Sequence, residues 1–346
     1  TFSSPSNIMS VGSKLFSGCS KISSITWNSS IAIPSEAISD IANPNMLLYV
    51  KMQSYAPSSV KNVVVNGNAQ SITLSDADGN NNFYCPTSFT AQKISYIHNY
   101  SMESGIGVCK GWETIALPFD VQSIVHPVNG IAAPFLKNDE TAKLFWLNSL
   151  DGVSFTPASR IVANTPYIIC MPNNANYADS YLLAGDITFS AENAMVSASD
   201  KINKGYKGEY VFVPAFTSVS KSNSIYPINR NQEYNGYNPG STFVSDLRDV
   251  RPFEAYITTT SASAKRCFDI TDVSTDISTI PLKESEMKMY SENGIVYIVS
   301  NKKMKIHIYD MTGRLVKIVE AVAGVNEVRG LYKGIYMITD HKIIVK

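Results

Sequence analysis

The stretch Lys305-Ile306-His307-Ile308-Tyr309, followed by Asp310-Met311-Thr312-Gly313-Arg314, shows the fold class most clearly. Apolar and polar residues alternate in the first five residues, which is the pattern of a β-strand with one buried face. The next five residues favour a turn, so they predict a reversal into a second strand. More short apolar runs follow towards the C-terminus. We therefore predict a compact β-sandwich over residues 286–346.

This segment also contains sequence motifs of a known domain. The motifs are Ile306-x-Ile308-Tyr309-Asp310-x-x-Gly313-Arg314-Leu315-Val316, Gly330-Leu331-x-x-Gly334-Ile335-Tyr336, Lys342 and Lys346. They resemble the C-terminal sorting domain of proteins that the type IX secretion system of Bacteroidetes exports. The resemblance implies an Ig-like β-sandwich and a protein that reaches the outer-membrane surface. The family's opening Pro-Asn-Pro-Ala word is replaced by Met289-Tyr290-Ser291-Glu292-Asn293, a departure that concerns the export signal rather than the fold.

Upstream of this segment, residues 271–285 are rich in Thr, Ser and Asp and predict a linker. Residues 59–270 contain many short runs of β-branched and aromatic residues, separated by polar or Gly-containing turns, without a convincing helical period. Such spacing predicts a large antiparallel β-sandwich. The words Gly111–Phe119, Ala163–Ile168 and Arg251–Tyr256 resemble the β-domain that follows the repeats in Bacteroides-type surface proteins, a fold without an assigned chemistry.

The N-terminal residues contain a repeat. Residues 14–27 align with residues 36–49 at an offset of 22, with apolar or aromatic residues at matching positions. Repeats of 20–29 residues are typical of leucine-rich repeats. The words between Val11 and Ile25 resemble the BspA-like leucine-rich repeats of bacterial surface proteins. We predict terminal repeats and a cap over residues 1–58. Two units are too few to be stable alone, so we expect further repeats upstream. Because the chain begins at Thr1 without a Met or a signal peptide, we also expect a leader.

Composition excludes two classes of function. Lys and Arg together number 29, as do Asp and Glu, and a chain without net charge lacks the basic surplus of a nucleic-acid-binding protein. No apolar run of about 18 residues occurs, so we expect no membrane insertion. Charged residues make up 17% of the chain, and a polar surface built instead from Ser, Asn, Thr and Tyr is common in extracellular β-proteins. We expect a monomer.

No catalytic or cofactor-binding pattern is recognisable. The four histidines are scattered without HExxH or HxH spacing, and we expect them at the surface. Nucleophile elbows and phosphate-binding glycine loops are missing. The five cysteines include no CxxC pair. We expect mostly buried thiols, with a Cys85–Cys109 disulfide as the alternative. The sequence therefore predicts a chain without enzymatic activity.

Two loops are candidate binding sites. Asp76, Asp78 and Asn80 place oxygen ligands as at the start of a calcium loop, but the twelfth position is Thr87 instead of Glu. A solvated hairpin turn is the favoured interpretation. Tyr234 and Tyr237 lie in an aromatic loop that could stack on a sugar or anchor a protein, because tyrosine brings contact area at low entropy cost. An ordinary turn is the favoured interpretation of this loop as well.

These patterns together favour a non-enzymatic adhesion or recognition protein, secreted or displayed at the cell surface. Its expected partner is a host or bacterial surface protein or a glycan. A carbohydrate-binding module is the first alternative, and exposed coplanar aromatic rings in a shallow groove would indicate it. An unrecognised hydrolase is the second alternative, and paired carboxylates in a deep pocket would indicate it.

Overall fold

The computed structural model describes residues 1–76, 81–106, 108–152, 154–259, 266–270, 288–292, 294–300, 303–338 and 341–345. The prediction of a mainly β chain is confirmed. The chain forms two compact units. Unit 1 comprises residues 1–174 and 180–279, and unit 2 comprises residues 175–179 and 280–346. The predicted linker at 271–285 lies outside the described residues.

Unit 1 begins with a ladder of short parallel strands. These are β1 (Phe2–Ser3), β2 (Ser24–Thr26), β3 (Leu47–Val50) and β4 (Val63–Val65). Phe2 lies beside Ile25, and Ile25 beside Leu48, so these rungs are 23 residues apart. The predicted offset of 22 is therefore one residue short in the strands. In the connecting segment the Phe16 N–H donates to the carbonyl of Ala37, 21 residues further along the chain.

The ladder joins a larger sheet without a break at residue 58. Leu48 packs in an apolar cluster of the ladder itself, whereas its neighbour Leu47 belongs to the main core of unit 1. This alternation follows from the strand period, which places successive side chains on opposite faces. One sheet therefore runs through the predicted end piece and the predicted sandwich.

The continuous sheet follows the order β1-β2-β3-β4-β5-β6-β13-β8-β9-β10-β12-β7, and β11 pairs with β10. Its further strands are β5 (Asn68–Ser75), β6 (Phe89–Tyr100), β7 (Glu113–Ile115), β8 (Ser123–His126), β9 (Gly130–Pro134), β10 (Lys143–Leu150), β11 (Phe155–Pro157), β12 (Tyr167–Cys170) and β13 (Gly185–Val196). Most of the later pairs are antiparallel, as predicted, but β5 with β6 and β9 with β10 are parallel. The chain crosses over before each second strand, and the 3-10 helix η2 (Phe135–Lys137) lies in one crossover.

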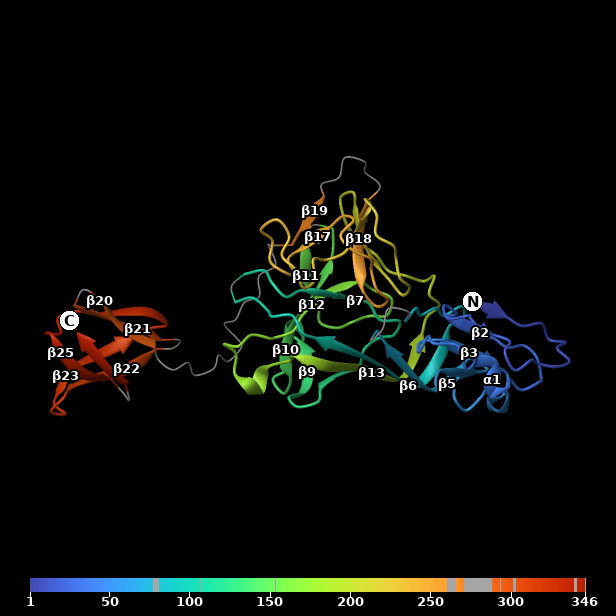
Figure 1. Ribbon diagram of the computed structural model, residues 1–346, viewed down its shortest axis with the longest axis horizontal. Coiled ribbons are helices and arrows are strands. Elements are labelled where there is room, and N and C mark those ends of the chain that lie inside the picture. Colours follow the sequence, from blue (N-terminus) through green and yellow to red (C-terminus); the bar gives the residue numbers. More distant parts are fainter. Residues whose placement is uncertain are drawn as a thin grey trace. The chain divides into compact units, whose positions relative to one another are not determined.

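A second layer of small sheets covers one side of this sheet (Figure 1). It contains β14 (Gly205–Lys207), β15 (Tyr210–Pro214), β16 (Ile225–Tyr226), β17 (Thr242–Val244), β18 (Ala255–Thr259) and β19 (Cys267–Asp269). Aromatic rings connect the layers: Phe253 lies 5.0 Å from Tyr96 of β6, measured between ring centroids. Phe83 and Phe216 complete this contact. The side chains of β6 that point towards the second layer are therefore deeply buried.

Unit 2 consists of two antiparallel sheets around its own core. One sheet has the order β20-β21-β24 and the other β23-β22-β25-β26. The strands are β20 (Lys288–Glu292), β21 (Ile295–Ser300), β22 (Met304–Asp310), β23 (Leu315–Ala321), β24 (Gly324–Val328), β25 (Gly334–Ile338) and β26 (His341–Val345). The alternation at 305–309 is confirmed, because Ile306 and Ile308 are buried in this core. Asp310 closes the predicted turn by accepting the N–H groups of Thr312 and Arg314.

Candidate functional site

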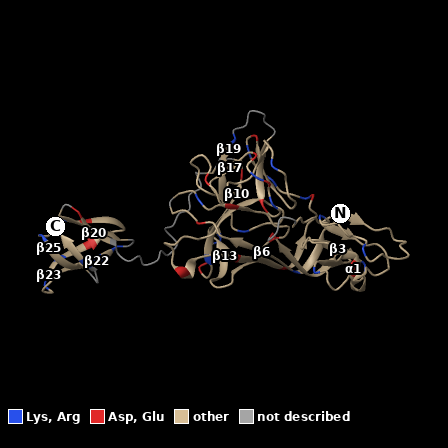
Figure 2. Cartoon of the chain, viewed as in Figure 1, with Lys and Arg blue, Asp and Glu red and all other residues tan. Residues whose placement is uncertain are grey.

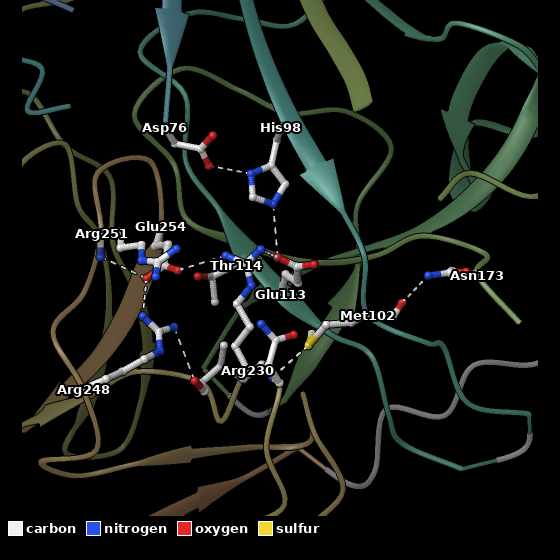
Figure 3. A network of polar contacts seen from close by, with 12 residues as sticks. Asp76, His98, Met102, Glu113, Thr114, Asn173, Arg230, Arg248, Arg251 and Glu254 are labelled. Atoms are coloured by element: carbon white, nitrogen blue, oxygen red, sulfur yellow. Dashed lines mark hydrogen bonds and ion pairs between the residues drawn. The ribbon is translucent and has the colours of Figure 1, made fainter. Parts of the chain in front are cut away.

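Six charged side chains from distant parts of the sequence meet inside unit 1 (Figure 3). They are Asp76, His98, Glu113, Arg230, Arg248 and Glu254, and we call them the charge cluster. Asp76 follows β5, His98 lies on β6 and Glu113 opens β7. The other three residues come from the loops of the second layer. The charge cluster therefore links the large sheet to the layer that covers it.

His98 is the centre of the charge cluster. Its Nδ1 lies 2.5 Å from Oδ2 of Asp76, and its Nε2 lies 3.1 Å from Oε2 of Glu113. The strand period of β6 places His98 on the inward face together with Tyr96, whose hydroxyl donates to Asp76 at 2.9 Å. Only 8% of His98 is exposed. The expectation of surface histidines is thus wrong here, because the partners that make burial tolerable lie elsewhere in the sequence.

The same expectation is wrong for His126. This residue is also buried, and its Nε2 lies 2.9 Å from the carbonyl oxygen of Ala184. Its Nδ1 accepts the N–H of Asn129 in the turn that follows β8. His126 therefore organises a turn through main-chain groups and has a structural role.

The two carboxylates keep His98 protonated. Burial alone would lower the pKa of His98, but the hydrogen bonds and charges of Asp76 and Glu113 raise it to about 9. Burial likewise raises the pKa of Asp76, yet the hydrogen bond and charge of His98 outweigh this effect and hold it below its ordinary value. At neutral pH the charge cluster thus contains three cations and three anions, so it carries no net charge.

Arginine side chains connect the remaining acids. Arg230 Nη2 lies 2.9 Å from Oε2 of Glu113, and Arg230 Nη1 lies 3.6 Å from Oε1 of Glu254. Arg248 Nη1 donates to Oε2 of Glu254 at 2.7 Å, and the Arg251 N–H donates to the same oxygen at 3.0 Å. These contacts fasten the loops at residues 229–231 and 248–254 onto the edge of the large sheet.

This arrangement suits a clamp better than an acid–base pair. A general base must be able to accept a proton, but both ring nitrogens of His98 are engaged by carboxylates and the ring is already charged. Among the described residues, no Ser, Thr or Cys side chain is hydrogen-bonded to His98. The nearest hydroxyl of that kind on β7, Thr114, accepts the Ala255 N–H at 3.0 Å and so adds to the clamp.

The calcium-like loop is only partly described. Asp76 belongs to the charge cluster, where Oδ2 of its carboxylate serves His98 and Tyr96, while Asp78 and Asn80 lie outside the described residues. Within the described ranges, no group of three His, Cys, Asp or Glu side chains is placed to hold a metal ion. Asn45 fastens both ends of the loop, because its Nδ2 donates to the carbonyls of Ser75 and Asn81.

The aromatic loop is a tight hairpin. Tyr234 and Tyr237 exchange main-chain hydrogen bonds of 3.0 and 2.8 Å. Asn235 and Gly236 both have positive φ, 47° and 84°, as a two-residue primed turn requires. Both tyrosines are half-buried. Asn229 holds the base of the hairpin by donating to the Asn238 carbonyl, so the loop is well defined. The structure brings neither tyrosine into the charge cluster.

The cysteines make different contacts. Cys85 Sγ lies 3.3 Å from the Tyr49 hydroxyl, and burial raises the pKa of this thiol to about 11. Cys109 Sγ donates to the carbonyl of Ile270, a different contact that leaves the Cys85–Cys109 disulfide alternative without support. Cys170 is fully buried in β12, as expected for a small apolar residue.

The outer face of the large sheet, away from the second layer, is a further candidate site. Ile97 of β6, Thr188 of β13, Val125 of β8 and Ile131 of β9 form one row across four paired strands. The adjacent row consists of Ser95, Ser190 and Ser123. We call these two rows the open face. The sequence does not show which strands are neighbours, so the rows could not be predicted.

The chain matches no protein-family model, no curated protein and no solved structure. Among the described residues, no helix has the length and apolar character needed to cross a membrane. The resemblances of the two ends of the chain therefore stay predictions from the sequence.

Proposed function

We propose that this chain is a non-enzymatic recognition protein of the extracellular or outer-membrane surface that binds a protein partner through the open face. The observation that carries the proposal is the row of Ile97, Thr188, Val125 and Ile131, which we call the apolar row. Ile97, Val125 and Ile131 are 43%, 36% and 56% exposed. Val125 and Ile131 are direct neighbours, whereas Thr188 lies between Val125 and Ile97. Exposed apolar side chains gathered on an outer surface are typical of interaction sites.

The chemistry of the open face favours a protein over a glycan. Sugars are recognised by stacking on exposed aromatic rings, whereas this row is aliphatic. The serines beside it offer hydrogen bonds without charge. Figure 2 shows that charged residues are sparse over most of the chain, so the partner need not be strongly charged. The carbohydrate-binding alternative would instead use Tyr234 and Tyr237, which are only half exposed.

Two further points support display without catalysis. Among the described residues, the six charged side chains of the charge cluster are occupied by one another. The location at the cell surface rests on the resemblance of the two ends of the chain to surface repeats and to a sorting domain. The parallel ladder with rungs 23 residues apart is compatible with such repeats.

A binding screen tests this proposal. We would measure binding of the chain to arrays of extracellular-matrix proteins, bacterial surface proteins and glycans. A double variant, Ile97→Lys with Val125→Lys, should weaken protein binding at least roughly tenfold, because charges at an apolar interface centre are poorly tolerated. The control is Met52→Lys, a residue that is 54% exposed in the ladder.

The outcomes separate the candidates. Protein binding that the double variant loses and the control keeps would support the open face. Equal loss or equal retention in both variants would refute it. Binding to glycans alone, abolished by Tyr234→Ala, would replace the proposal with the carbohydrate-binding alternative.

A further inference from the structure

The large sheet splits between β8 and β9. These strands pair only at Val125 with Ile131 and at His126 with Gly130. Beyond that point β8 continues along β13 through Ile124 and Ser123, whereas β9 turns to pair with β10. A groove of about 530 Å³ lies in the split. Two strand edges therefore flank a groove that is lined by side chains of both strands.

Beyond the split, the described strand pairs join each strand to a neighbour on one side: Ser123 and Ile124 to β13, and residues 132–134 to β10. Successive residues of a strand direct their N–H and C=O groups to alternate sides, so part of the main chain at 123–124 and 132–134 points across the split. Unpaired strand edges are templates for an additional strand. The floor is apolar: Ile124, Ala132, Pro134 and Ile161 are buried residues that line the groove. Small or aliphatic side chains of an inserted strand would pack on it.

One cation at the groove has no carboxylate partner. Arg160 lines the groove and is exposed, and no Asp or Glu of the described residues lies within ion-pairing distance of it. Lys137, the other cation there, lies 3.7 Å from Asp139. Oδ1 of Asp139 also accepts the N–H and the hydroxyl of Thr141. The groove thus offers one guanidinium for an incoming anion.

We propose that this groove binds an extended, acidic peptide segment of a partner protein. The segment adds as a strand between β8 and β9 and places a carboxylate against Arg160. Main-chain hydrogen bonds supply affinity in such strand addition, and side-chain contacts select the sequence. An Arg–carboxylate pair is directional because the guanidinium can donate two parallel hydrogen bonds. The inference deepens the proposed recognition of proteins. Ser123 and Ile131 of the open face also line the groove, but the split and Arg160 carry this inference rather than Ile97 and Val125.

Synthetic peptides test the proposal on the full chain. The probe is a short peptide of alternating Val and Thr with one central Glu, and its affinity is measured by fluorescence polarisation. A matched peptide carries Gln in place of Glu, and a third is N-methylated at alternate residues. We expect saturable binding of the Glu peptide, roughly tenfold weaker binding of the Gln peptide, and loss of binding on N-methylation.

A substitution of Arg160 tests whether this residue binds the carboxylate of the peptide. Arg160→Gln should weaken the Glu peptide roughly tenfold and leave the affinity for the Gln peptide unchanged. Lys201→Gln, at an exposed residue of the same unit, is the control. Amide chemical-shift changes should concentrate at 123–124 and 132–133. Absence of binding, equal binding of the N-methylated peptide, or an unchanged affinity in Arg160→Gln would overturn the proposal. Because the apolar row is intact in these variants, failure here leaves the array experiment on Ile97 and Val125 to decide the proposed function separately.

Discussion

At the residue scale, His98 makes the stability of unit 1 depend on pH. Its pKa is about 9 in the folded chain and about 6.5 in an unfolded one. The folded state therefore holds the proton more tightly. The stabilisation that results is complete below about pH 6.5 and is lost as the pH rises through about 9. We expect the free energy of unfolding, measured by urea denaturation, to fall by on the order of 3 kcal/mol over this interval.

Two substitutions check the origin of this slope. His98→Gln cannot carry the charge, so it should be less stable at pH 6.5 and should lose most of the decline towards pH 9. His126→Gln is the matched control, because His126 is equally buried but bonds to main-chain groups rather than to carboxylates. The His126→Gln variant should keep the decline in the free energy of unfolding towards pH 9. A wild-type chain whose stability is flat between these pH values would contradict the assignment.

Only part of the environment of His98 can be inferred from the sequence. Tyr96, His98 and Tyr100 alternate along β6 and share its buried face, but the sequence analysis expected His98 at the surface. A histidine that faces the protein interior needs a hydrogen-bonding partner. The sequence contains Asp76, an acidic residue that can serve as one. The contact with Arg230, through Glu113, joins segments more than a hundred residues apart. No local pattern encodes such a contact, so the charge cluster could be found only in the folded chain.

At the scale of elements, Asn45 connects the ladder to β5. It is fully buried, its Oδ1 accepts the Ser75 N–H at 2.9 Å, and its Nδ2 donates to the carbonyls of Ser75 and Asn81. Asn45→Asp keeps the shape but replaces the donor with a second acceptor that faces two carbonyls. We expect a loss of about 3 kcal/mol or more in thermal or urea unfolding, because buried polar groups are left unpaired.

The control for this prediction is Asn68→Asp on β5. Asn68 is exposed, and its side-chain amide donates to the Asn66 carbonyl. Its substitution should change stability by less than about 0.5 kcal/mol. Hydrogen exchange at the end of β5 should accelerate in Asn45→Asp and not in Asn68→Asp. Equal stability of the two variants would show that the asparagine is not a connecting residue.

The strands themselves were more predictable than their pairing. Runs such as Tyr167–Cys170 and Tyr210–Pro214 were recognisable because β-branched and aromatic residues cluster between turns. The parallel pairing of β5 with β6 and of β9 with β10 was not recognisable from the sequence. It depends on crossover connections whose course no local residue pattern determines. The groove proposed as a peptide site arises from the second of these pairings and was equally invisible.

At the scale of the whole molecule, the two units differ in how completely they bury their apolar residues. Unit 1 has an extensive core that includes Tyr96 and Phe253. Unit 2 has a small core, and several of its large apolar side chains are exposed, among them Leu315, Val325 and Ile344. A small sandwich buries a smaller fraction of its surface than a large domain. We therefore expect unit 2 to be the less stable of the two.

Residues 288–346 should nevertheless fold when expressed alone. Their two sheets enclose a core that contains Val296, Ile308 and Ile338, each fully buried, and all strand pairs close within this segment. We expect a cooperative urea transition by circular dichroism, with a free energy of unfolding of about 3–5 kcal/mol. Ile308→Ala should abolish the transition, since removing a buried aliphatic side chain costs about 2–5 kcal/mol. Val325→Ala, at a position that is 60% exposed, should leave it nearly unchanged. A gradual, non-cooperative signal from the wild-type segment would show instead that these sheets depend on the rest of the chain.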